Sequence, residues 1–579
     1  MKKRTLFLGL ASVLILSLTY WSWKQLKFAP VSESVLNLSL DNAVESLDPA
    51  KAFSDDSLVV SAQVMEPLYQ YHYLKRPYEI QPLLAEGLPQ FSENGTKITI
   101  KIKKKVFYHP HPAFKNEPRE MIAEDFVNQF KRLALDSLKS PGRSIFANIV
   151  SGFEGYGSLV NDNWKEIHVS ALQGVEASDR YTLKITLTKA EPNIIFYLAL
   201  NFIVPVPWEV IEHEQNKLDH IMVGTGPYLL RSASPEFFEL KKNPHYREDF
   251  YPTSGDRYAN IQKLLDSSKE KIPFIDVVRF HQTHEADRWK KFFDHELDLL
   301  SVPKTFIPEL YNTNGELSDT LKDQGILLKQ FPILANRWFA FNMRDPILGK
   351  NKDLRKAIAY SIDYQKYIQM MSQNTNLRAN SILVPGISGY LPTQELRYSY
   401  DKEKALDHYA KAGYKDPSKM PVIRYSTRGV QPIHIMEAEF IRDQLSPFGI
   451  KVEIEKLEFS DFLRKGRAGE LMFFTDNWLF DYPEGENIIQ LLVSGNFPGV
   501  NKSAYSNPDV DRLYASLKTT FNHEMREKVF HEIDEIIWEE LPWIPMMYES
   551  SFVLQYPEIK NFRKSSIIRN YVKYLKITK

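Results

Sequence analysis

The stretch Gly224-Thr225-Gly226-Pro227-Tyr228 lies inside a chain of 579 residues and has the composition of a tight turn. Glycines permit backbone dihedral angles that other residues rarely adopt, and Pro227 fixes one φ angle. This chemistry favours a structural turn between folded parts over direct contact with a ligand. A chain of this length has room for about four domains of ~150 residues each. We therefore expect a multidomain protein in which this turn joins larger units.

The composition is that of a folded protein without an excess of either charge. Hydrophobic residues make up 43% and charged residues 25%, which fits a globular chain. The 73 basic residues balance the 73 acidic residues, so the chain has no net charge. Overall electrostatic attraction therefore does not favour a nucleic acid or an anionic membrane surface as the main partner. The chain contains no cysteine, which excludes disulfides, thiol nucleophiles and thiolate metal sites. Its many aromatic residues suit both cores and binding clefts.

Hydrophobic periodicity predicts a mixture of strands and helices. Residues 36–40 and 97–103 alternate between apolar and polar, as half-buried strands do, and Asn94-Gly95 suits the turn of a hairpin before the second run. Apolar residues recur at helical spacing in four other segments. The first begins at Ala123, and the others are residues 354–361, 403–412 and 525–540. Gly413 suits the C-terminal cap of the third. Strands and helices do not alternate strictly, so we predict a large α/β protein with mixed sheets.

The N-terminal segment predicts export. Basic residues at positions 2–4 precede an uncharged run from Thr5 to Trp23, which is just long enough to cross a ~30 Å hydrocarbon core as a helix. Such a segment is typical of a secretory signal or an uncleaved signal anchor. Tyr20, Trp21 and Trp23 fit a membrane interface and favour the anchor. Residues 1–30 are therefore interpreted as a signal anchor or signal peptide that places the rest of the chain outside the cytoplasm.

Motifs for catalysis and for metal binding are not found. The chain has no phosphate-binding loop, no dinucleotide fingerprint, no nucleophile elbow and no pair of histidines with zincin spacing. The segment His109-Pro110-His111-Pro112 places two imidazoles close together, but its spacing suggests no carboxylate partner, so an ordinary surface loop is the favoured interpretation. We accordingly expect no catalytic residues, no metal and no cofactor.

Several short segments, in the correct order, resemble one family of binding proteins. The chain is similar to the peptide- and nickel-type (family 5) extracytoplasmic solute-binding proteins of ABC transporters, which include oligopeptide- and dipeptide-binding proteins. Each segment is weak alone, but their order and spacing extend from about residue 34 to residue 579. The matching segments are Glu45–Ala50, Met65–Tyr69, Gln81–Glu86, Gly224–Tyr228, Asn243–Tyr246, Tyr400–Tyr414 and Trp478–Pro483.

The resemblance implies a fold of two lobes. It is the clamshell of periplasmic binding proteins, class II-like, with three domains and with hinges where the chain crosses between lobes. The first domain is expected to be discontinuous, with the second inserted into it and the third forming the opposite lobe. The expected boundaries are 34–75, 201–285 and 541–579 for domain I, 76–200 for domain II and 286–540 for domain III.

The resemblance also implies a ligand site. By analogy with the family, Asp481 would hold the α-amino group of a peptide, and Trp478 would line a side-chain pocket beside Tyr482. A carboxylate among aromatic rings suits an ammonium group, although an aspartate shortly before Pro483 would also suit a turn. Val44 and Glu45 would lie on an edge strand that pairs with the peptide backbone.

Other conspicuous polar residues have structural interpretations. Asp48 precedes Pro49 and fits a turn former. Arg355 and Asp363 lie on predicted helices, where salt bridges or capping explain them. Two features depart from the family: the lipid-attachment cysteine is missing, and Thr475-Asp476-Asn477 lacks the basic residue with which some relatives meet a peptide carboxylate.

These observations predict an exported binding protein that captures peptides between two lobes and delivers them to a membrane permease. We expect a periplasmic monomer, tethered to the inner membrane by its N-terminal helix, with no nucleic-acid partner. One alternative keeps the fold and changes the cargo to a metal chelate or an oligosaccharide. A second is a tethered sensor or receptor without a permease. A hydrolase is disfavoured because nucleophile motifs are missing.

Overall fold

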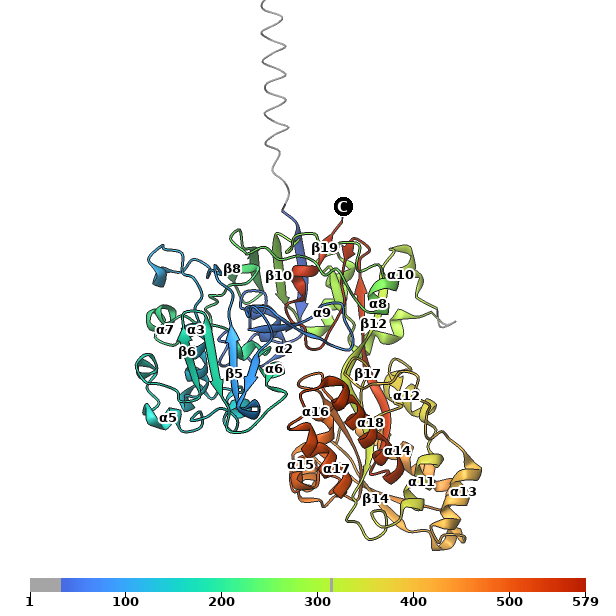
Figure 1. Ribbon diagram of the computed structural model, residues 1–579. Helices are drawn as coiled ribbons and strands as arrows, with labels where there is room; N and C mark the ends of the chain where they lie inside the picture. Colours follow the sequence, from blue (N-terminus) through green and yellow to red (C-terminus); the bar gives the residue numbers. More distant parts are fainter. Residues whose placement is uncertain (1–32, 313–315, 579) are drawn as a thin grey trace, which may run out of the picture.

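A computed structural model describes residues 33–312 and 316–578 and shows two lobes (Figure 1). The predicted membrane segment Thr5–Trp23 lies outside the described residues. Within the described part of the chain, no helix is both long and apolar enough to cross a membrane. The upper lobe in Figure 1 holds β1–β11 and α2–α10, and the lower lobe holds α11–α18.

Two four-stranded sheets organise the upper lobe. The first has the order β1-β10-β9-β8, in which β1 and β10 are parallel and the other pairs are antiparallel. Side chains of β1 alternate between half-buried and buried positions, as the sequence predicts. The bounds are β1 (Val35–Leu40), β8 (Tyr228–Ala233), β9 (Phe237–Lys242) and β10 (Val277–Gln282).

The second sheet confirms the predicted hairpin. Its order is β4-β5-β7-β6, and Ser92 pairs with Lys97 across a turn in which Asn94 has a φ of 55°. The apolar face of α3 (Ala123–Leu133) is buried, so the predicted helix is confirmed as well. The strands are β4 (Gln90–Ser92), β5 (Lys97–Lys101), β6 (Val175–Asp179) and β7 (Thr182–Thr186).

Shorter elements complete the upper lobe. The two-stranded sheets are β2 (Tyr69–Tyr71) with β3 (Ile80–Pro82) and β18 (Ile559–Lys560) with β19 (Lys576–Ile577). The helices are α2 (Asp55–Ser61), α4 (Arg143–Phe146), α5 (Tyr156–Leu159), α6 (Ile194–Tyr197), α7 (Trp208–His213), α8 (Arg257–Ile261), α9 (Glu285–Phe293) and α10 (Asp319–Asp323).

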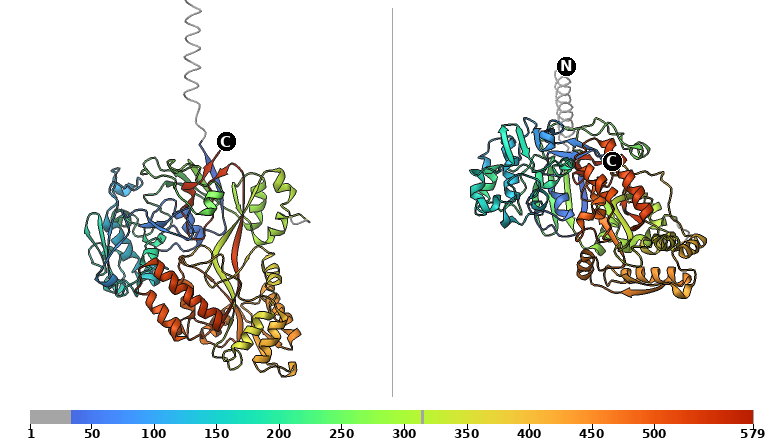
Figure 2. Two further views of the ribbon diagram at one scale, coloured as in Figure 1. Left: turned by 45° about the vertical axis from the view of Figure 1, so that its right-hand side comes forward. Right: turned by 60° about the horizontal axis from the view of Figure 1, so that its bottom comes forward.

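Two long antiparallel strands, β12 (Leu327–Phe341) and β17 (Trp543–Gln555), run from one lobe into the other (Figures 1 and 2). They form the centre of a seven-stranded sheet, β11-β17-β12-β16-β14-β15, with β13 also on β17. A bulge interrupts their register, because Pro332 pairs with Ser550 whereas Asn336 pairs with Tyr548. The remaining strands are β11 (Leu299–Ser301), β13 (Leu377–Arg378), β14 (Val422–Ser426), β15 (Lys451–Glu455) and β16 (Phe473–Leu479).

The hydrophobic cores change at this bulge. On β12, Phe331 packs in the core of the upper lobe, whereas Leu334 packs in a core of the lower lobe. On β17, Phe552 packs in the upper core and Tyr548 packs in the lower one. The crossing strands therefore connect two separately packed bodies.

The lower lobe confirms the three helices predicted there. Asp363 caps α12 by accepting a hydrogen bond from the Lys366 N–H, and the Arg355 guanidinium binds carbonyl groups at the end of α18. The helices are α11 (Lys352–Ser361), α12 (Tyr364–Ser372), α13 (Lys402–Lys411), α14 (Pro432–Leu445), α15 (Phe459–Ala468), α16 (Glu486–Ile489), α17 (Pro508–Leu517) and α18 (His523–Glu540).

The 224–228 stretch packs inside the upper lobe against the backbone of Val64, and its role as a turn between domains stays a prediction. A Cβ atom on Gly224 would lie 2.0 Å from the Val64 carbonyl oxygen, and one on Gly226 would lie 2.6 Å from it. The Gly226 N–H donates to the same oxygen at 2.9 Å. The predicted reason for the glycines is wrong, because neither has a left-handed φ: they are required for close backbone approach.

Candidate functional site

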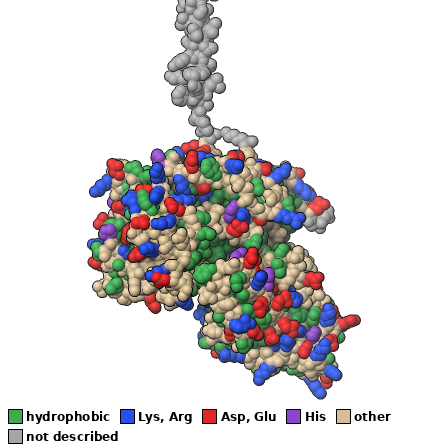
Figure 3. Space-filling view, viewed as in Figure 1, with side chains coloured by type: hydrophobic (Ala, Val, Ile, Leu, Met, Phe, Trp, Pro, Cys, Tyr) green, Lys and Arg blue, Asp and Glu red, His purple; other side chains and the backbone are tan. Residues whose placement is uncertain are grey.

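The surface is hollowed between the two lobes, and hydrophobic side chains gather in this recess (Figure 3). Aromatic rings join the lobes beside it. The Tyr482 ring of the lower lobe stacks on Phe196 of α6 with centroids 5.7 Å apart, and its edge meets Tyr197 at 5.5 Å. One predicted site residue therefore lies at the junction of the lobes.

Trp478 and Asp481 are held together by a residue that the sequence analysis missed. Trp478 lies near the end of β16, and Asn487 lies in the following helix, α16. The Asn487 Oδ1 accepts the Trp478 Nε1–H at 2.7 Å and the Asp481 N–H at 3.3 Å, while its Nδ2 donates to the Asp481 Oδ2 at 3.3 Å. Only its proximity to the motif along the chain could have suggested Asn487.

The Asp481 carboxyl is exposed, yet nearby protein atoms partly desolvate it. This desolvation raises its pKa above the ordinary value, and the hydrogen bond from Asn487 opposes the shift. Among residues 33–312 and 316–578, no basic side chain forms an ion pair with it. A carboxylate with this environment can pair with an ammonium group of a ligand.

Val44 and Glu45 follow β1 on the upper lobe, in a segment without an assigned strand. The Val44 N–H donates to the Gln282 Oε1 at 3.4 Å and the Glu45 N–H donates to the Ser57 Oγ at 3.2 Å. Their role in ligand binding stays a prediction.

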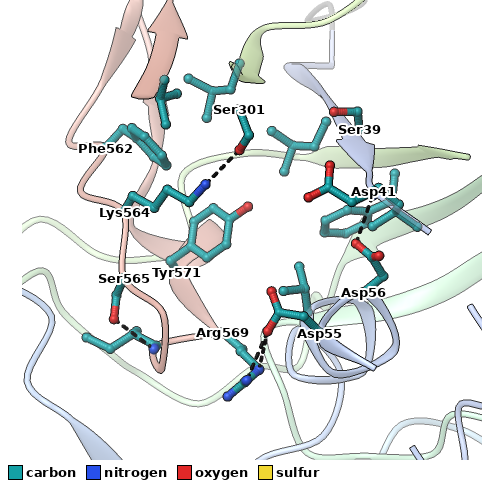
Figure 4. A pocket seen from close by; sticks show the side chains of 17 residues that line it. Ser39, Asp41, Asp55, Asp56, Ser301, Phe562, Lys564, Ser565, Arg569 and Tyr571 are labelled. Carbon is teal, nitrogen blue, oxygen red and sulfur yellow. Dashed lines mark hydrogen bonds and ion pairs between the residues drawn. The ribbon is translucent and has the colours of Figure 1, made fainter. Parts of the chain in front are cut away.

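A small polar pocket of about 110 Å³ lies at the end of β1 (Figure 4). Lys564 points into it and donates to the Ser301 Oγ at 2.8 Å, and burial lowers the pKa of this lysine. At its rim, Arg569 pairs with Asp55 at 2.9 Å. The sequence does not reveal this pocket, because its walls come from segments far apart in the chain.

Next to the aromatic contact, a buried polar cluster joins the lobes. Arg526 of α18 donates to the Glu484 Oε1 at 2.7 Å and the Glu486 Oε2 at 3.3 Å, both on the lower lobe. It also donates to the Oδ1 of Asn193, an upper-lobe residue, at 3.0 Å. Burial raises the pKa of Glu484, and Arg526 opposes that shift. The lobes therefore meet through specific hydrogen bonds as well as through aromatic rings.

Two α/β lobes joined by a pair of strands, with a recess between them, are the architecture of hinged binding proteins. A family model described as "Bacterial extracellular solute-binding proteins, family 5 Middle" matches residues 79–498. The chain belongs to this family, and the resemblance found in its sequence is confirmed.

Known relatives align with this chain over most of its length and most of their own. The heme-binding protein A of Haemophilus influenzae is 25% identical over 517 residues, which cover 87% of this chain and 85% of the relative. The dipeptide-binding protein DppE of Bacillus subtilis is 25% identical over 558 residues, or 94% of this chain and 91% of the relative. The structure of HbpA2 from Haemophilus parasuis superposes with a TM-score of 0.76 at 22% identity and covers 94% of this chain and 100% of that one.

Proposed function

We propose that this protein captures peptides between its two lobes and delivers them to the permease of an ABC importer. The observation that carries the proposal is the exposed Asp481 carboxylate, which has no basic partner among the described residues and shares Asn487 with Trp478. The next residue, Tyr482, contacts the upper lobe. A peptide supplies an α-ammonium group that such a carboxylate would bind, and partial desolvation would strengthen the pairing. The dipeptide-binding relative supports this class of cargo.

The mechanism would be closure of the lobes around the ligand. A ligand that touches both lobes favours the closed state by its higher affinity for that state. The bulge between Pro332 and Asn336 on β12 offers the bending point, because the packed cores on either side of it are separate. The Phe196–Tyr482 contact lies where the lobes would tighten.

The three-domain division is part of this proposal. We place domain II at 76–200 and domain I in the segments 34–75, 201–285 and 541–579, with the other lobe as domain III. Leu299, Leu310 and Phe331 pack in the upper core, which favours the strand crossing over residue 286 as the start of the opposite lobe. The location would be extracytoplasmic, as the family description indicates. The segment 5–23 would tether a monomer to the membrane.

The test combines one substitution with one change in the ligand. Calorimetry would measure the binding of a peptide and of the same peptide with an acetylated N-terminus, which carries no ammonium. We expect Asp481→Asn to weaken binding of the free peptide by about tenfold or more, equivalent to about 1.4 kcal/mol. Acetylation should weaken binding to the unaltered protein equally and should have little further effect on the variant.

Asp461→Asn provides a matched control, because Asp461 is an exposed aspartate on α15 of the same lobe. It should bind both peptides as the unaltered protein does. Equal affinities of Asp481→Asn and the unaltered protein for the free peptide would refute the ammonium-binding role. Mass spectrometry of the ligand released from protein purified from its native host identifies the cargo directly.

A metal chelate is the second candidate cargo, because one relative is a heme-binding protein. The aromatic lining near Trp478 and Tyr482 would suit a flat macrocycle. Titration with heme, followed by its absorption spectrum, distinguishes the two. If heme is the cargo, it should saturate the protein at one equivalent and peptides should not displace it.

A further inference from the structure

A separate cluster of three potential metal ligands lies on the upper lobe, where α7 forms part of the outer edge in Figure 1. It consists of His111, His213 and Glu214, whose ligand atoms all lie within 4.8 Å of one another. We propose that these three side chains bind a divalent transition metal of the Zn²⁺ class. The proposal does not depend on the cargo, because the recess is built from other elements.

The spacing of the ligand atoms fits a small tetrahedral ion. Zn²⁺ binds imidazole nitrogen and carboxylate oxygen at about 2.0–2.2 Å, so two tetrahedral ligand atoms lie roughly 3.3–3.5 Å apart. The His111 Nε2 and the Glu214 Oε1 are 3.4 Å apart. The His213 Nδ1 is 2.7 Å from the same oxygen and would have to move outward by less than an ångström. Two imidazoles and one carboxylate leave a fourth position for water.

The backbone around the ligands restricts their positions. Pro110 and Pro112 flank His111 and fix one φ angle each, and the 3₁₀ helix η2 (Pro112–Phe114) follows directly. His213 is the last residue of α7, and Glu214 caps that helix. The carbonyl groups at a helix C-terminus favour a cation. The three ligands therefore come from two packed segments, which a metal ion would link.

The His111 ring can meet a metal ion through Nε2, the nitrogen that faces the Glu214 Oε1. A neutral imidazole can offer a lone pair to a metal ion. Binding at Nε2 moves the remaining proton to Nδ1, which would break the hydrogen bond that Nδ1 accepts from the Ala113 N–H. That bond caps the 3₁₀ helix η2 at 3.3 Å, so the free energy of metal binding must outweigh its loss.

His109 does not join this site. Its ring is buried, and its Nε2–H donates to the Gly226 carbonyl oxygen at 3.1 Å. The His-Pro-His-Pro segment thus contributes one ligand rather than two. Its partners come from a distant part of the sequence, which is why spacing along the chain suggested no carboxylate and led to a prediction of no metal.

The test is calorimetric titration of the tag-free full-length protein with Zn²⁺. We expect one equivalent to bind, and His111→Ala, His213→Ala and Glu214→Gln each to weaken binding by about tenfold or more. His220→Ala and Glu212→Gln are matched controls, because both residues are exposed, lie close to α7 and do not belong to the cluster. Each control should bind Zn²⁺ as the unaltered protein does.

A spectroscopic measurement separates this site from nonspecific binding. Co²⁺ in place of Zn²⁺ should give the intense visible absorption of a four-coordinate site, and His111→Ala should abolish it. Mg²⁺ should not compete, because it prefers oxygen ligands. The inference fails if the three cluster variants retain the affinity of the unaltered protein, or if the unaltered protein binds no Zn²⁺ at 100 times its own concentration.

Discussion

Asp48 and Arg132 form an ion pair whose side chains are both completely buried. The Asp48 Oδ2 accepts from the Arg132 Nη2 at 2.7 Å, and the Oδ1 also accepts the Ala50 N–H at 2.8 Å. The aspartate is thus a turn former, as predicted, and also the counter-ion of a buried guanidinium. Buried charges are tolerated only when such partners are present.

Removal of this counter-ion should strongly destabilise the upper lobe. We expect Asp48→Ala to lower the free energy of unfolding by about 3–5 kcal/mol, because Arg132 would remain charged and unpaired in the interior. Urea denaturation followed by circular dichroism measures the change. Asp407→Ala, which removes an exposed ion pair with Lys411, should change stability little. A similar effect of both substitutions would contradict this explanation.

His109 should make stability depend on pH. Burial lowers its pKa from 6.5 to about 4 in the folded protein. Between these two values the unfolded chain binds more protons, so this contribution is complete above pH 6.5 and is lost as the pH falls toward 4. Between pH 7 and 4.5 the loss should be roughly 2–3 kcal/mol.

The variant His109→Gln isolates this effect. It keeps a donor for the Gly226 carbonyl oxygen but cannot titrate. Its unfolding free energy should therefore change less with pH than that of the unaltered protein. Parallel pH profiles from urea melts of the two proteins would contradict the assignment.

At this scale, sequence identifies residues within motifs but rarely their distant partners. Trp478 and Asp481 were predicted together, and the structure brings them together through Asn487. Arg132 was not predicted as the partner of Asp48, because 84 residues separate them. Such contacts depend on how whole elements pack, and one sequence contains little information about that packing.

At the scale of elements, strong periodicity predicted well. The hairpin β4–β5 and the helices α3 and α18 formed because their apolar faces match one side of a strand or helix. The crossing strands β12 and β17 were not predicted. Their apolar pattern changes where they pass from one core to the other, so no single period describes them.

The end of α18 illustrates how one side chain can stabilise an element. Arg355 donates to the carbonyl oxygens of Glu540 at 2.6 Å and Leu541 at 3.1 Å. It also binds two carbonyls of the segment before α11, and burial lowers its pKa to about 10. The carbonyl groups of Glu540 and Leu541 lie at the end of α18, where no following helical turn supplies N–H donors for them.

Arg355→Met should leave these carbonyl groups without their donor. We expect a loss of about 2–4 kcal/mol in the free energy of unfolding and faster hydrogen exchange in the last turn of α18. Lys528→Met on the exposed face of the same helix should change neither quantity appreciably. Unchanged exchange at the end of α18 in the Arg355 variant would contradict the capping role.

At the scale of the whole molecule, the contact between lobes suggests a way to observe closure. The chain has no cysteine, so a pair introduced at Ser158 and Ser460 can be labelled selectively. Both residues are exposed, the first on α5 of the upper lobe and the second on α15 of the lower lobe. Energy transfer between dyes at these positions reports the distance between lobes.

We expect saturating peptide to change the transfer efficiency toward a shorter distance, because the ligand would bridge the lobes. The same pair in a protein that also carries Asp481→Asn should need a higher peptide concentration for the same change. An efficiency that stays constant at saturation would exclude closure as the response to this ligand.

The strands β12 and β17 contribute residues to both lobes, and this has a consequence for how the protein can evolve. Their paired residues resume on both sides of the bulge, so the lobes can rotate about this strand pair without repacking of either core. Walls that meet the cargo can then diverge freely while the strand pair is preserved. A single scaffold of this kind can acquire new cargo preferences by surface substitution alone and still keep one mechanical cycle.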